Sequence, residues 1–554
     1  MNRLYRLLAF GYFPKELPPI FSTRTFARHT HSQPDIERLA GNRWQRSSPY
    51  LLQQKPHYRR RLDIVCPQAI LGQASIISSH YDDIRTFFTN HPGNCSRPAF
   101  NRKAKFQRAV RPFAIGRGYT QRKLELRSRF PIILKLDIKN YYRSIYTHSI
   151  PWAIHGKGYA KIHIREDNLG NKLDRAVQYG QDGQTIGIPT GPDTSFIISE
   201  IILSRIVDEL ISNERIKQDR FIRYYDDIEY GCEDEGETHK VLAAFEDALG
   251  DFELEINPEK VEIFSGPSAI ESAWLYRLRD IQKKEGIKAN EITEIFSFLA
   301  ELAQRYPNDH VFRYFLRKMR TSVVDESAWD AYQRILLSLF QENRGNAREV
   351  FDQLSYYKAI GWRLNRKALK EALDRKVHNQ LTRAATSELS WAVYGYMKFD
   401  ININKELAEM VLHRGDCPSR VLVTKIIFDR GLALKSSINS IIRSWGDDVL
   451  NSTEWLLAYE ALVNKWHNRY TSINLPENHE LVEHLRDNEI SFIDSTIMDR
   501  IALPQIFKKC STVGEREVDE NEFDLMDFLG NEDDDVEDET TEDDDDVDNV
   551  SYDD

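Results

Sequence analysis

One short stretch, residues 221–230, constrains the fold most strongly because it places two adjacent carboxylates between two β-prone runs. Aromatic and β-branched residues flank Asp226 and Asp227 on both sides, which favours two short strands joined by a tight turn at the acids. Neighbouring carboxylates repel each other unless a cation lies between them, and a divalent metal ion is a common solution. A plain solvated turn is the alternative, because aspartate is also a frequent turn residue.

A third carboxylate follows a run that is typical of a buried strand. Residues 132–136 are almost continuously apolar, and Asp137 comes directly after them. Nucleotidyl transfer uses two Mg²⁺ ions roughly 3.5–4 Å apart, held by carboxylates from separate elements. Asp137, Asp226 and Asp227 supply such a set, so we expect them to be catalytic and to converge on a shared pair of ions. Mn²⁺ is the alternative ion.

Four segments resemble, in order and spacing, the palm motifs A, B, C and D of reverse transcriptases: residues 137–145, 187–195, 224–227 and 254–260. The sequences of these segments are most similar to those of the defence-associated, abortive-infection group of bacterial reverse transcriptases. Residues 11–19 and 146–157 also resemble that group. The resemblance covers residues 8–280 and rests on architecture alone beyond them. It implies an antiviral DNA polymerase that either copies RNA or works without a template, in some relatives primed on a protein tyrosine.

The resemblance also implies roles for single residues. The main-chain carbonyl of Ile138 would complete the metal shell, and Tyr142 would lie beneath the incoming sugar and exclude a 2′-hydroxyl, which implies deoxynucleotide substrates. Gly191 would let the backbone approach the nucleotide, and Lys260 would lie near the leaving pyrophosphate. A core tyrosine and a surface lysine are the plainer interpretations. Many family members have glutamine where this chain has Thr190. This difference puts in doubt how closely the site checks the nascent base pair.

Two arginine-rich segments are candidates for binding phosphates. Three consecutive arginines open one strand-like run, and Arg61 or a neighbour would clamp the incoming triphosphate, because arginine contacts phosphate in a bidentate way. A solvated basic edge is the alternative there. Residues 97–129 contain eleven Lys or Arg against one acid, interleaved with aromatic residues. This density predicts a groove for a nucleic-acid backbone, with Arg108, Arg111 and Arg117 as the best candidates.

Charge is unevenly distributed along the chain. Residues 518–554 contain twenty acids and no Lys or Arg, so the rest of the chain carries +9 although the whole carries −11. A basic body suits a protein that binds a polyanion. The tail over residues 514–554 is acidic and low in complexity, which predicts disorder. It either only solubilises the protein or mimics nucleic acid in the basic groove.

Length and periodicity predict an α+β right-hand polymerase followed by a helical region. A chain of 554 residues is too long for one core. We expect fingers over residues 1–135, a palm with an antiparallel sheet over 136–280, and an all-α, repeat-like domain over 281–513 before the tail. In the helical region, aromatic residues recur with helical periodicity, as over 329–340 and 455–466, and are expected to form core.

Composition narrows the setting and the partners. Five scattered cysteines without paired spacing support neither a zinc cluster nor a disulfide framework. No run reaches the ~18 apolar residues of a membrane span, so we expect a cytoplasmic protein that does not bind membranes. The expected partners are dNTPs, RNA or single-stranded DNA, with a cognate non-coding RNA as an option, and further copies of the chain in a trimer or hexamer by analogy. A catalytically retired nucleic-acid-binding scaffold and an RNA polymerase are the alternative functions.

Overall fold

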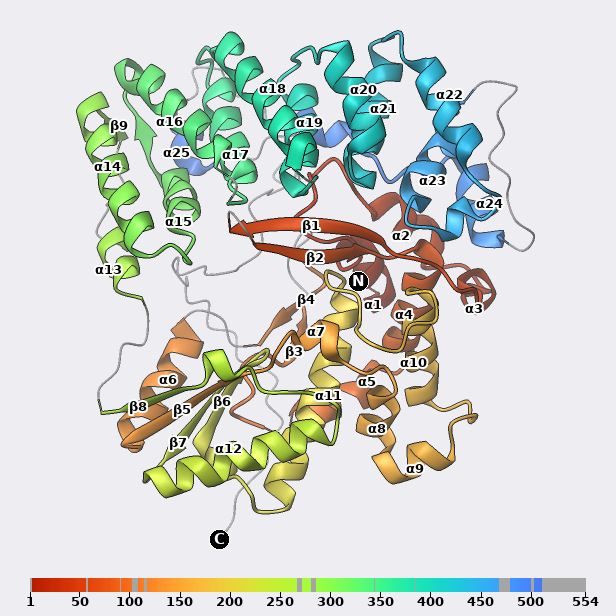
Figure 1. Ribbon diagram of the computed structural model, residues 1–554, viewed down its shortest axis with the longest axis vertical. Coiled ribbons are helices and arrows are strands. Elements are labelled where there is room, and N and C mark those ends of the chain that lie inside the picture. The colour runs from red at the N-terminus through yellow and green to blue at the C-terminus, as the bar shows by residue number, and fades with distance from the viewer. Residues whose placement is uncertain are drawn as a thin grey trace.

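The computed structural model describes residues 2–510 apart from 56–57, 90, 102–107, 114–116, 267–271, 280–284, 343, 384, 468–478 and 500–502. The described part has three tiers (Figure 1): a row of C-terminal helices lies above a two-stranded ribbon, and a four-stranded sheet with its helices lies below that ribbon. The tail over residues 514–554, for which disorder is predicted, lies outside the described residues. No helix of the described part is long and apolar enough to cross a membrane.

The N-terminal part combines helices with two small antiparallel ribbons. Its helices are α1 (Arg3–Phe10), α2 (Arg24–Thr30), α3 (Ile36–Ala40), α4 (Pro67–Ser79), α5 (Tyr81–Thr89) and α6 (Arg117–Arg129). The ribbons are β1 (Ser48–Lys55) with β2 (Tyr58–Ile64) and β3 (Pro98–Phe100) with β4 (Val110–Pro112). Strand β2 is exposed over its arginine-rich first half and buried from Leu62 onward, so its arginines lie at the surface while its end enters the core.

The central sheet is antiparallel with the strand order β6–β7–β5–β8, where β5 is Ile132–Asp137, β6 Phe221–Tyr224, β7 Asp227–Cys232 and β8 Glu262–Ser265. Because side chains alternate along a strand, Leu134 and Leu136 face the main core, whereas Ile133 joins a smaller cluster with Leu126 of α6 and with Phe130, which follows that helix. Both faces of β5 are therefore covered, which explains its almost continuous apolar sequence.

The helices around the sheet are α7 (Tyr141–Ser144), α8 (Ser149–His155), α9 (Lys157–Ile162), α10 (Leu169–Tyr179), α11 (Asp193–Ser212) and α12 (Glu235–Gly250). Helix α12 packs on β5 and β7, and α6 packs on β6 and β7. Most side chains of α11 are buried. Helix α11 runs beside the sheet through the lower tier (Figure 1).

A buried ion pair ties strand β6 to helix α11. Arg223 and Glu200 are each 1% exposed, and two guanidinium nitrogens donate to the two carboxylate oxygens at 2.9 and 2.8 Å. Ser96 donates to the same carboxylate, and Arg223 also donates to the Ser204 hydroxyl. The hairpin that carries Asp226 is therefore fixed to α11 by a bidentate, charge-assisted contact.

The C-terminal region is largely helical, with α13 (Ala273–Arg279), α14 (Ala289–Arg305), α15 (Val311–Lys318), α16 (Trp329–Gln341), α17 (Ala347–Ala359), α18 (Arg366–Arg383), α19 (Ser387–Lys398), α20 (Lys405–Arg414), α21 (Cys417–Asp429), α22 (Lys435–Ser444), α23 (Trp455–Val463), α24 (Glu480–Asp487) and α25 (Gln505–Cys510). The prediction of an all-α region is wrong in one detail. Strands β9 (Glu285–Ile287) and β10 (Val323–Val324) pair in parallel. The prediction that the aromatic faces form core is confirmed, because Trp329, Tyr332 and Tyr459 are buried.

The helical region shares one hydrophobic core with the N-terminal part. Trp455 is buried and its indole nitrogen donates to the Ile64 carbonyl at 3.0 Å. Phe492 packs among rings from the start of the chain, with centroid distances of 6.2 Å to Tyr12 and 5.6 Å to Phe26. The first and last described parts of the chain therefore complete each other's interior.

The pair between Glu200 and Arg223 leads to a stability prediction. Glu200→Gln removes the partner of a buried guanidinium, which should lower the free energy of unfolding by about 3 kcal/mol. Urea denaturation followed by circular dichroism measures this loss.

Glu209→Gln is the matched control, because Glu209 lies on the same helix and pairs with Arg205 near the surface. This exposed pair should contribute below about 0.5 kcal/mol. Equal losses in the two variants would show that burial does not determine the contribution of the pair.

Candidate active site

The β6–β7 hairpin presents Asp226 at its tip. Tyr224 pairs with Asp227, so the loop consists of Tyr225 and Asp226, one residue earlier than the turn predicted at the two acids. Tyr225 has a φ of 53°, and primed two-residue turns need such left-handed backbone at their first position. Its ring packs against Phe196 of α11, with 5.0 Å between centroids. Packing on α11 therefore supports a turn conformation that a tyrosine rarely adopts.

Asp137 lies directly opposite Asp227 on the neighbouring strand. The Asp137 carbonyl accepts a hydrogen bond from the Asn257 N–H at 2.8 Å, so the peptide groups of Asp137 point away from β7. The two aspartates therefore form a non-hydrogen-bonded pair, in which Cα atoms are roughly 4.5 Å apart and side chains are closest. The next carbonyl, that of Ile138, points the opposite way, toward the hairpin with Asp226. The structure thus brings the three acids and this carbonyl together.

The three carboxylates repel one another, and Lys260 partly neutralises them. Burial and the charges of Asp227 and Asp137 raise the pKa of Asp226 to about 6. Burial also raises the pKa of Asp227. Lys260 Nζ donates to Asp137 Oδ2 at 2.7 Å. Although burial lowers the pKa of Lys260, the hydrogen bond to Asp137 and the three negative charges raise it overall. The cluster is therefore an anionic site that already holds one cation.

The donor set of this cluster fits magnesium, because carboxylate and carbonyl oxygens are the ligands that this ion prefers. In the described part of the chain, no three His, Cys, Asp or Glu side chains lie so that they could hold a metal ion as they stand. The Lys260 ammonium instead contacts Asp137. A metal ion would replace this ammonium at Asp137 and offset the repulsion that raises the pKa of Asp226.

Tyr142 lies beside the carboxylates on α7. Its side chain is partly buried, and the Ser199 hydroxyl donates to its phenolic oxygen at 3.3 Å. Its carbonyl accepts a hydrogen bond from the Ile188 N–H at 2.8 Å, which joins the motif A and motif B segments. Burial and the charges of Glu200 and Asp226 raise the pKa of Tyr142. The phenol therefore stays neutral next to the carboxylate cluster.

The sequence pattern does not predict Asp63, which connects Arg61 to the two motif segments. Its carboxylate is 4% exposed and accepts from Arg61 Nε at 3.0 Å and from Arg143 Nη1 at 3.2 Å. The Asp63 N–H donates to the Thr190 carbonyl at 2.9 Å, and the Asp63 carboxylate accepts from the Thr190 N–H at 3.3 Å. One buried acid therefore orients two arginines. The only signal in the sequence is an acid directly after a run of arginines and a leucine.

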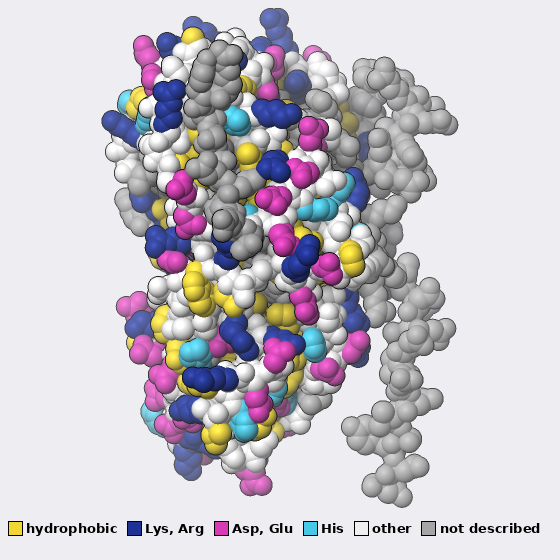
Figure 2. All heavy atoms as spheres, turned by 90° about the vertical axis from the view of Figure 1, so that its right-hand side faces the viewer, with side chains coloured by type: hydrophobic (Ala, Val, Ile, Leu, Met, Phe, Trp, Pro, Cys, Tyr) yellow, Lys and Arg dark blue, Asp and Glu magenta, His cyan; other side chains and the backbone are white. Residues whose placement is uncertain are grey.

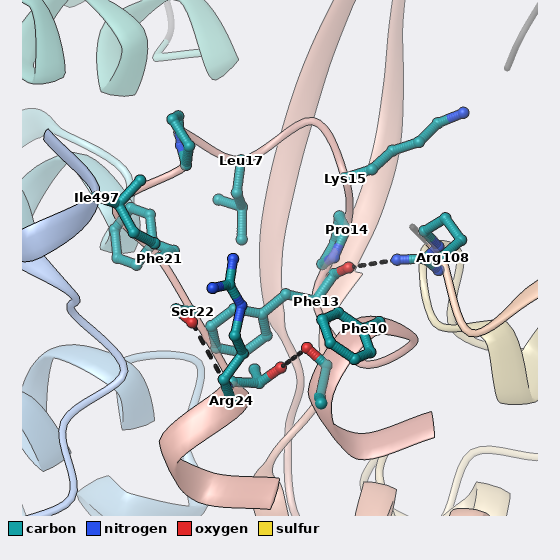
Figure 3. Close-up of a pocket in the computed structure, with 13 residues that line it drawn as sticks. Phe10, Phe13, Pro14, Lys15, Leu17, Phe21, Ser22, Arg24, Arg108 and Ile497 are labelled. Atoms are coloured by element: carbon teal, nitrogen blue, oxygen red, sulfur yellow. Dashed lines mark hydrogen bonds between the residues drawn. The ribbon is translucent and has the colours of Figure 1, made fainter. Parts of the chain in front are cut away.

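The prediction that Arg108 contacts a nucleic-acid backbone needs correction, because its guanidinium binds groups of the protein itself. Its guanidinium donates to the buried Asp193 carboxylate at 2.9 Å, to the Gly191 carbonyl at 2.6 Å and to the Phe13 carbonyl at 2.7 Å, the last shown in Figure 3. Gly191 has a φ of 132°, and a Cβ there would lie 2.8 Å from Pro14. The structure therefore gives both Arg108 and Gly191 a packing role in the motif B segment.

The remaining basic candidates divide into two groups. Arg111 is exposed on β4, and Arg117 begins α6 but its side chain lies outside what the structure describes. Further along α6, Lys123 and Arg127 pair with the buried Glu229 at 3.1 Å each. Figure 2 shows cations and acids mixed on the face at the right of Figure 1. The basic stretch therefore partly supports the sheet and is only partly available to a ligand.

A carboxylate cluster with arginines and a lysine beside it can hold divalent cations and a polyphosphate, as a nucleotidyltransferase must. Residues 94–299 match the family described as "Reverse transcriptase (RNA-dependent DNA polymerase)". The chain therefore contains a reverse transcriptase domain, and such domains form the RNA-directed DNA polymerase class of nucleotidyltransferases. The matched residues include all three acids, which confirms the reverse transcriptase part of the resemblance. No curated protein matches the chain.

Solved structures of telomerase are distantly similar to the chain. Apo telomerase from Candida tropicalis, truncated from its C-terminal domain, has a TM-score of 0.27 and 14% identity, covering 45% of this chain and 56% of that one. Telomerase from Candida albicans with a telomeric RNA fragment has a TM-score of 0.27 and 11% identity, covering 76% and 67%. Another apo structure from Candida tropicalis has 0.29 and 12%, covering 75% and 72%. Similarity at TM-scores this low does not establish a shared fold. The chain spans 56% of the length of the first structure.

The raised pKa of Asp226 leads to a prediction about stability. Because its folded pKa of about 6 exceeds the ordinary 3.8, the ionised carboxylate lowers stability at high pH, and this cost disappears as the pH falls toward 4. Asp226→Asn should therefore raise the free energy of unfolding by about 2 kcal/mol at pH 8 and by below ~1 kcal/mol at pH 4. Urea denaturation in EDTA measures the difference.

Asp219→Asn is a control that should change the free energy of unfolding in the opposite direction, because the hydrogen bond from Arg129 lowers the pKa of the exposed Asp219. Any effect of this substitution should be a loss of stability at pH 8 that fades in acid. Adding Mg²⁺ at pH 8 should stabilise the wild type more than Asp226→Asn. A destabilised Asp226→Asn in EDTA at pH 8 would contradict the predicted repulsion.

Proposed function

We propose that the chain is a reverse transcriptase-like DNA polymerase that joins deoxynucleotides by two-metal catalysis. The observation that supports this proposal is the meeting of Asp137, Asp226 and Asp227 at the end of one sheet, inside the residues that match the reverse transcriptase family. Two Mg²⁺ ions, or Mn²⁺ in their place, supply an activated hydroxyl and hold the triphosphate when bound. The proposed substrates are dNTPs with RNA or single-stranded DNA.

In this proposal, four groups of the cluster hold the ions. Asp137, Asp226 and Asp227 would hold the ions through their carboxylate oxygens, and the Ile138 carbonyl would add a neutral oxygen. The register between β5 and β7 holds Asp137 opposite Asp227 before any substrate binds. Catalysis then depends mainly on positioning and charge neutralisation.

Other side chains would hold the nucleotide. Arg61, oriented by Asp63, contacts the triphosphate, and Tyr142 lies under the sugar. Because Gly191 has no Cβ, the motif B segment packs closely against Pro14. This packing would fix the position of the backbone beside the base. Lys260, which contacts Asp137 in this structure, would lie near the leaving pyrophosphate and neutralise its charge.

The proposed architecture is a right hand with a helical extension. Strands β5 to β8 with α11 and α12 form the palm, and the segments before β5 form the fingers. The proposed boundary between them lies at residue 135, within β5. The helices over residues 281–513 form the extension, which covers the β1–β2 ribbon in Figure 1.

The proposed biological role is defence of bacteria against phage from within the cytoplasm. It rests on the resemblance of the motif segments and of residues 11–19 and 146–157 to abortive-infection reverse transcriptases. The DNA product would act as the effector, made on an RNA template or without a template.

The catalytic assignment leads to an activity prediction. Asp226→Asn with Asp227→Asn should reduce incorporation of labelled dNTPs in Mg²⁺ by at least about 1000-fold, because the metal site loses two of its charges. Omitting or adding nuclease-treated RNA in the same assay separates templated from untemplated synthesis.

Asp247→Asn with Asp251→Asn removes two exposed acids at the end of α12 and is the matched control, which should keep wild-type activity. Where expression of the wild type protects cells from phage, only the catalytic double variant should abolish protection. Unchanged incorporation by a folded Asp226→Asn, Asp227→Asn protein would refute the polymerase assignment and leave a nucleic-acid-binding scaffold.

The position of Tyr142 leads to a prediction about sugar selection. Tyr142→Ala should lower the ratio of kcat/KM for dNTPs to that for rNTPs by about tenfold or more, because the ring no longer blocks a 2′-hydroxyl. Tyr142→Phe keeps the ring and should keep the ratio. A wild-type preference for rNTPs that Tyr142→Ala leaves unchanged would indicate an RNA polymerase instead.

A further inference from the structure

A large basic cavity lies in the N-terminal part and contains none of the carboxylate-cluster residues. It has a volume of about 710 Å³ and is lined by residues of α1, α5 and β3, by Arg97 before β3 and by Phe113 after β4. Pockets of roughly 300–1,000 Å³ accommodate ligands of nucleotide size. The cavity is therefore large enough for a nucleotide and not only for a simple ion.

The charge of this cavity comes from four arginines, Arg3, Arg6, Arg85 and Arg97. Among the described residues that line it, no side chain is acidic. At the edge of the cavity, Arg3 pairs with the exposed Asp82 at 2.8 Å. Burial lowers the pKa of Arg6 and of Arg97, and the charge of Arg122 lowers that of Arg97 further. The cavity is therefore an electropositive environment that favours an anion.

Aromatic rings form the other part of the wall. The Arg97 guanidinium lies 3.5 Å from the centroid of the Phe113 ring, and that ring is 54% exposed. Arg3 lies 4.9 Å from the centroid of the Tyr81 ring. Tyr81 in turn contacts Phe100 edge to face at 4.6 Å, and its hydroxyl donates to the Pro98 carbonyl at 3.1 Å. Stacked guanidinium and aromatic planes of this kind are surfaces on which unpaired bases stack.

We propose that this cavity binds a nucleotide unit of single-stranded nucleic acid, with phosphates on the arginines and a base on the Arg97–Phe113 side. Charge alone would suit any polyanion, but the pairing of arginines with an exposed ring suits a strand that offers both phosphates and bases. The inference rests on the proposed function in taking nucleic acid as the partner. It adds a contact region formed by α1, α5 and the β3–β4 hairpin.

The location of the cavity links it to the motif B segment. The Val110 N–H of β4 donates to the Asp193 carboxylate at 3.0 Å, and Asp193 begins α11 directly after that segment. Arg6 is also within electrostatic range of Asp193. A strand held in the cavity would therefore lie next to the element that lines the nucleotide site, and would be kept in register with it.

The test measures oligonucleotide binding without catalysis. Full-length protein with Asp226→Asn is titrated into a labelled short oligothymidylate, and fluorescence anisotropy is followed at several salt concentrations. Arg3→Ala with Arg85→Ala changes one half-buried and one exposed arginine of the cavity and should raise Kd about tenfold and reduce the slope of log K against log salt by about 1. Phe113→Ala should raise Kd about fivefold or more with an unchanged salt slope, because it removes stacking but no charge.

Arg334→Ala with Arg443→Ala is the matched control, since it removes the same charge from exposed positions on α16 and α22. Thermal unfolding verifies that each variant is folded. The proposal is overturned if the cavity variants bind like this control. It is also overturned if polyglutamate of equal charge competes as well as the oligonucleotide, because the cavity would then select an acidic peptide. Loss of dNTP incorporation in the catalytic variant tests the proposed function separately, since binding here needs no catalysis.

Discussion

Repulsion among three carboxylates is the constraint on which the candidate site depends. A single sheet brings them together: Asp137 ends one strand, Asp227 begins the neighbouring one, and Asp226 occupies the turn before it. Such an arrangement lowers stability, as the raised pKa of Asp226 indicates. The rest of the fold must therefore hold the hairpin in place against its own charges, and the Glu200–Arg223 pair beneath it does so.

The same device recurs around the site. Buried acids bind cations at several points: Asp63 binds Arg61 and Arg143, Asp193 binds Arg108, and Glu229 binds Lys123 and Arg127. Each acid lies on or beside an element that carries site residues, and each would leave a buried charge if its partner were lost. The basic residues near the site therefore fall into two groups with different roles. Some fix the framework, and others remain exposed for a ligand.

The strands and acids could be predicted from sequence because their signals are local. The β-prone runs around Asp226 and before Asp137 predict strands, and the structure has them as β6, β7 and β5. Tertiary contacts were not predictable in this way. Asp63 meets Thr190 across 127 positions, and Arg108 was expected at a nucleic-acid groove although it binds Asp193. Neither spacing nor composition encodes which acid a given arginine will reach, so the contacts of the basic residues cannot be predicted from sequence.

The ring of Phe492 lies among Tyr12, Phe13 and Phe26. The interior of the N-terminal helices is therefore closed by a residue that lies almost five hundred positions further along the sequence. During synthesis on the ribosome, the first helices therefore emerge long before the group that covers them. Until then their aromatic faces stay open to water and to other chains. Such a topology makes folding of the nascent protein late and mostly post-translational, and makes the early segments natural clients of chaperones.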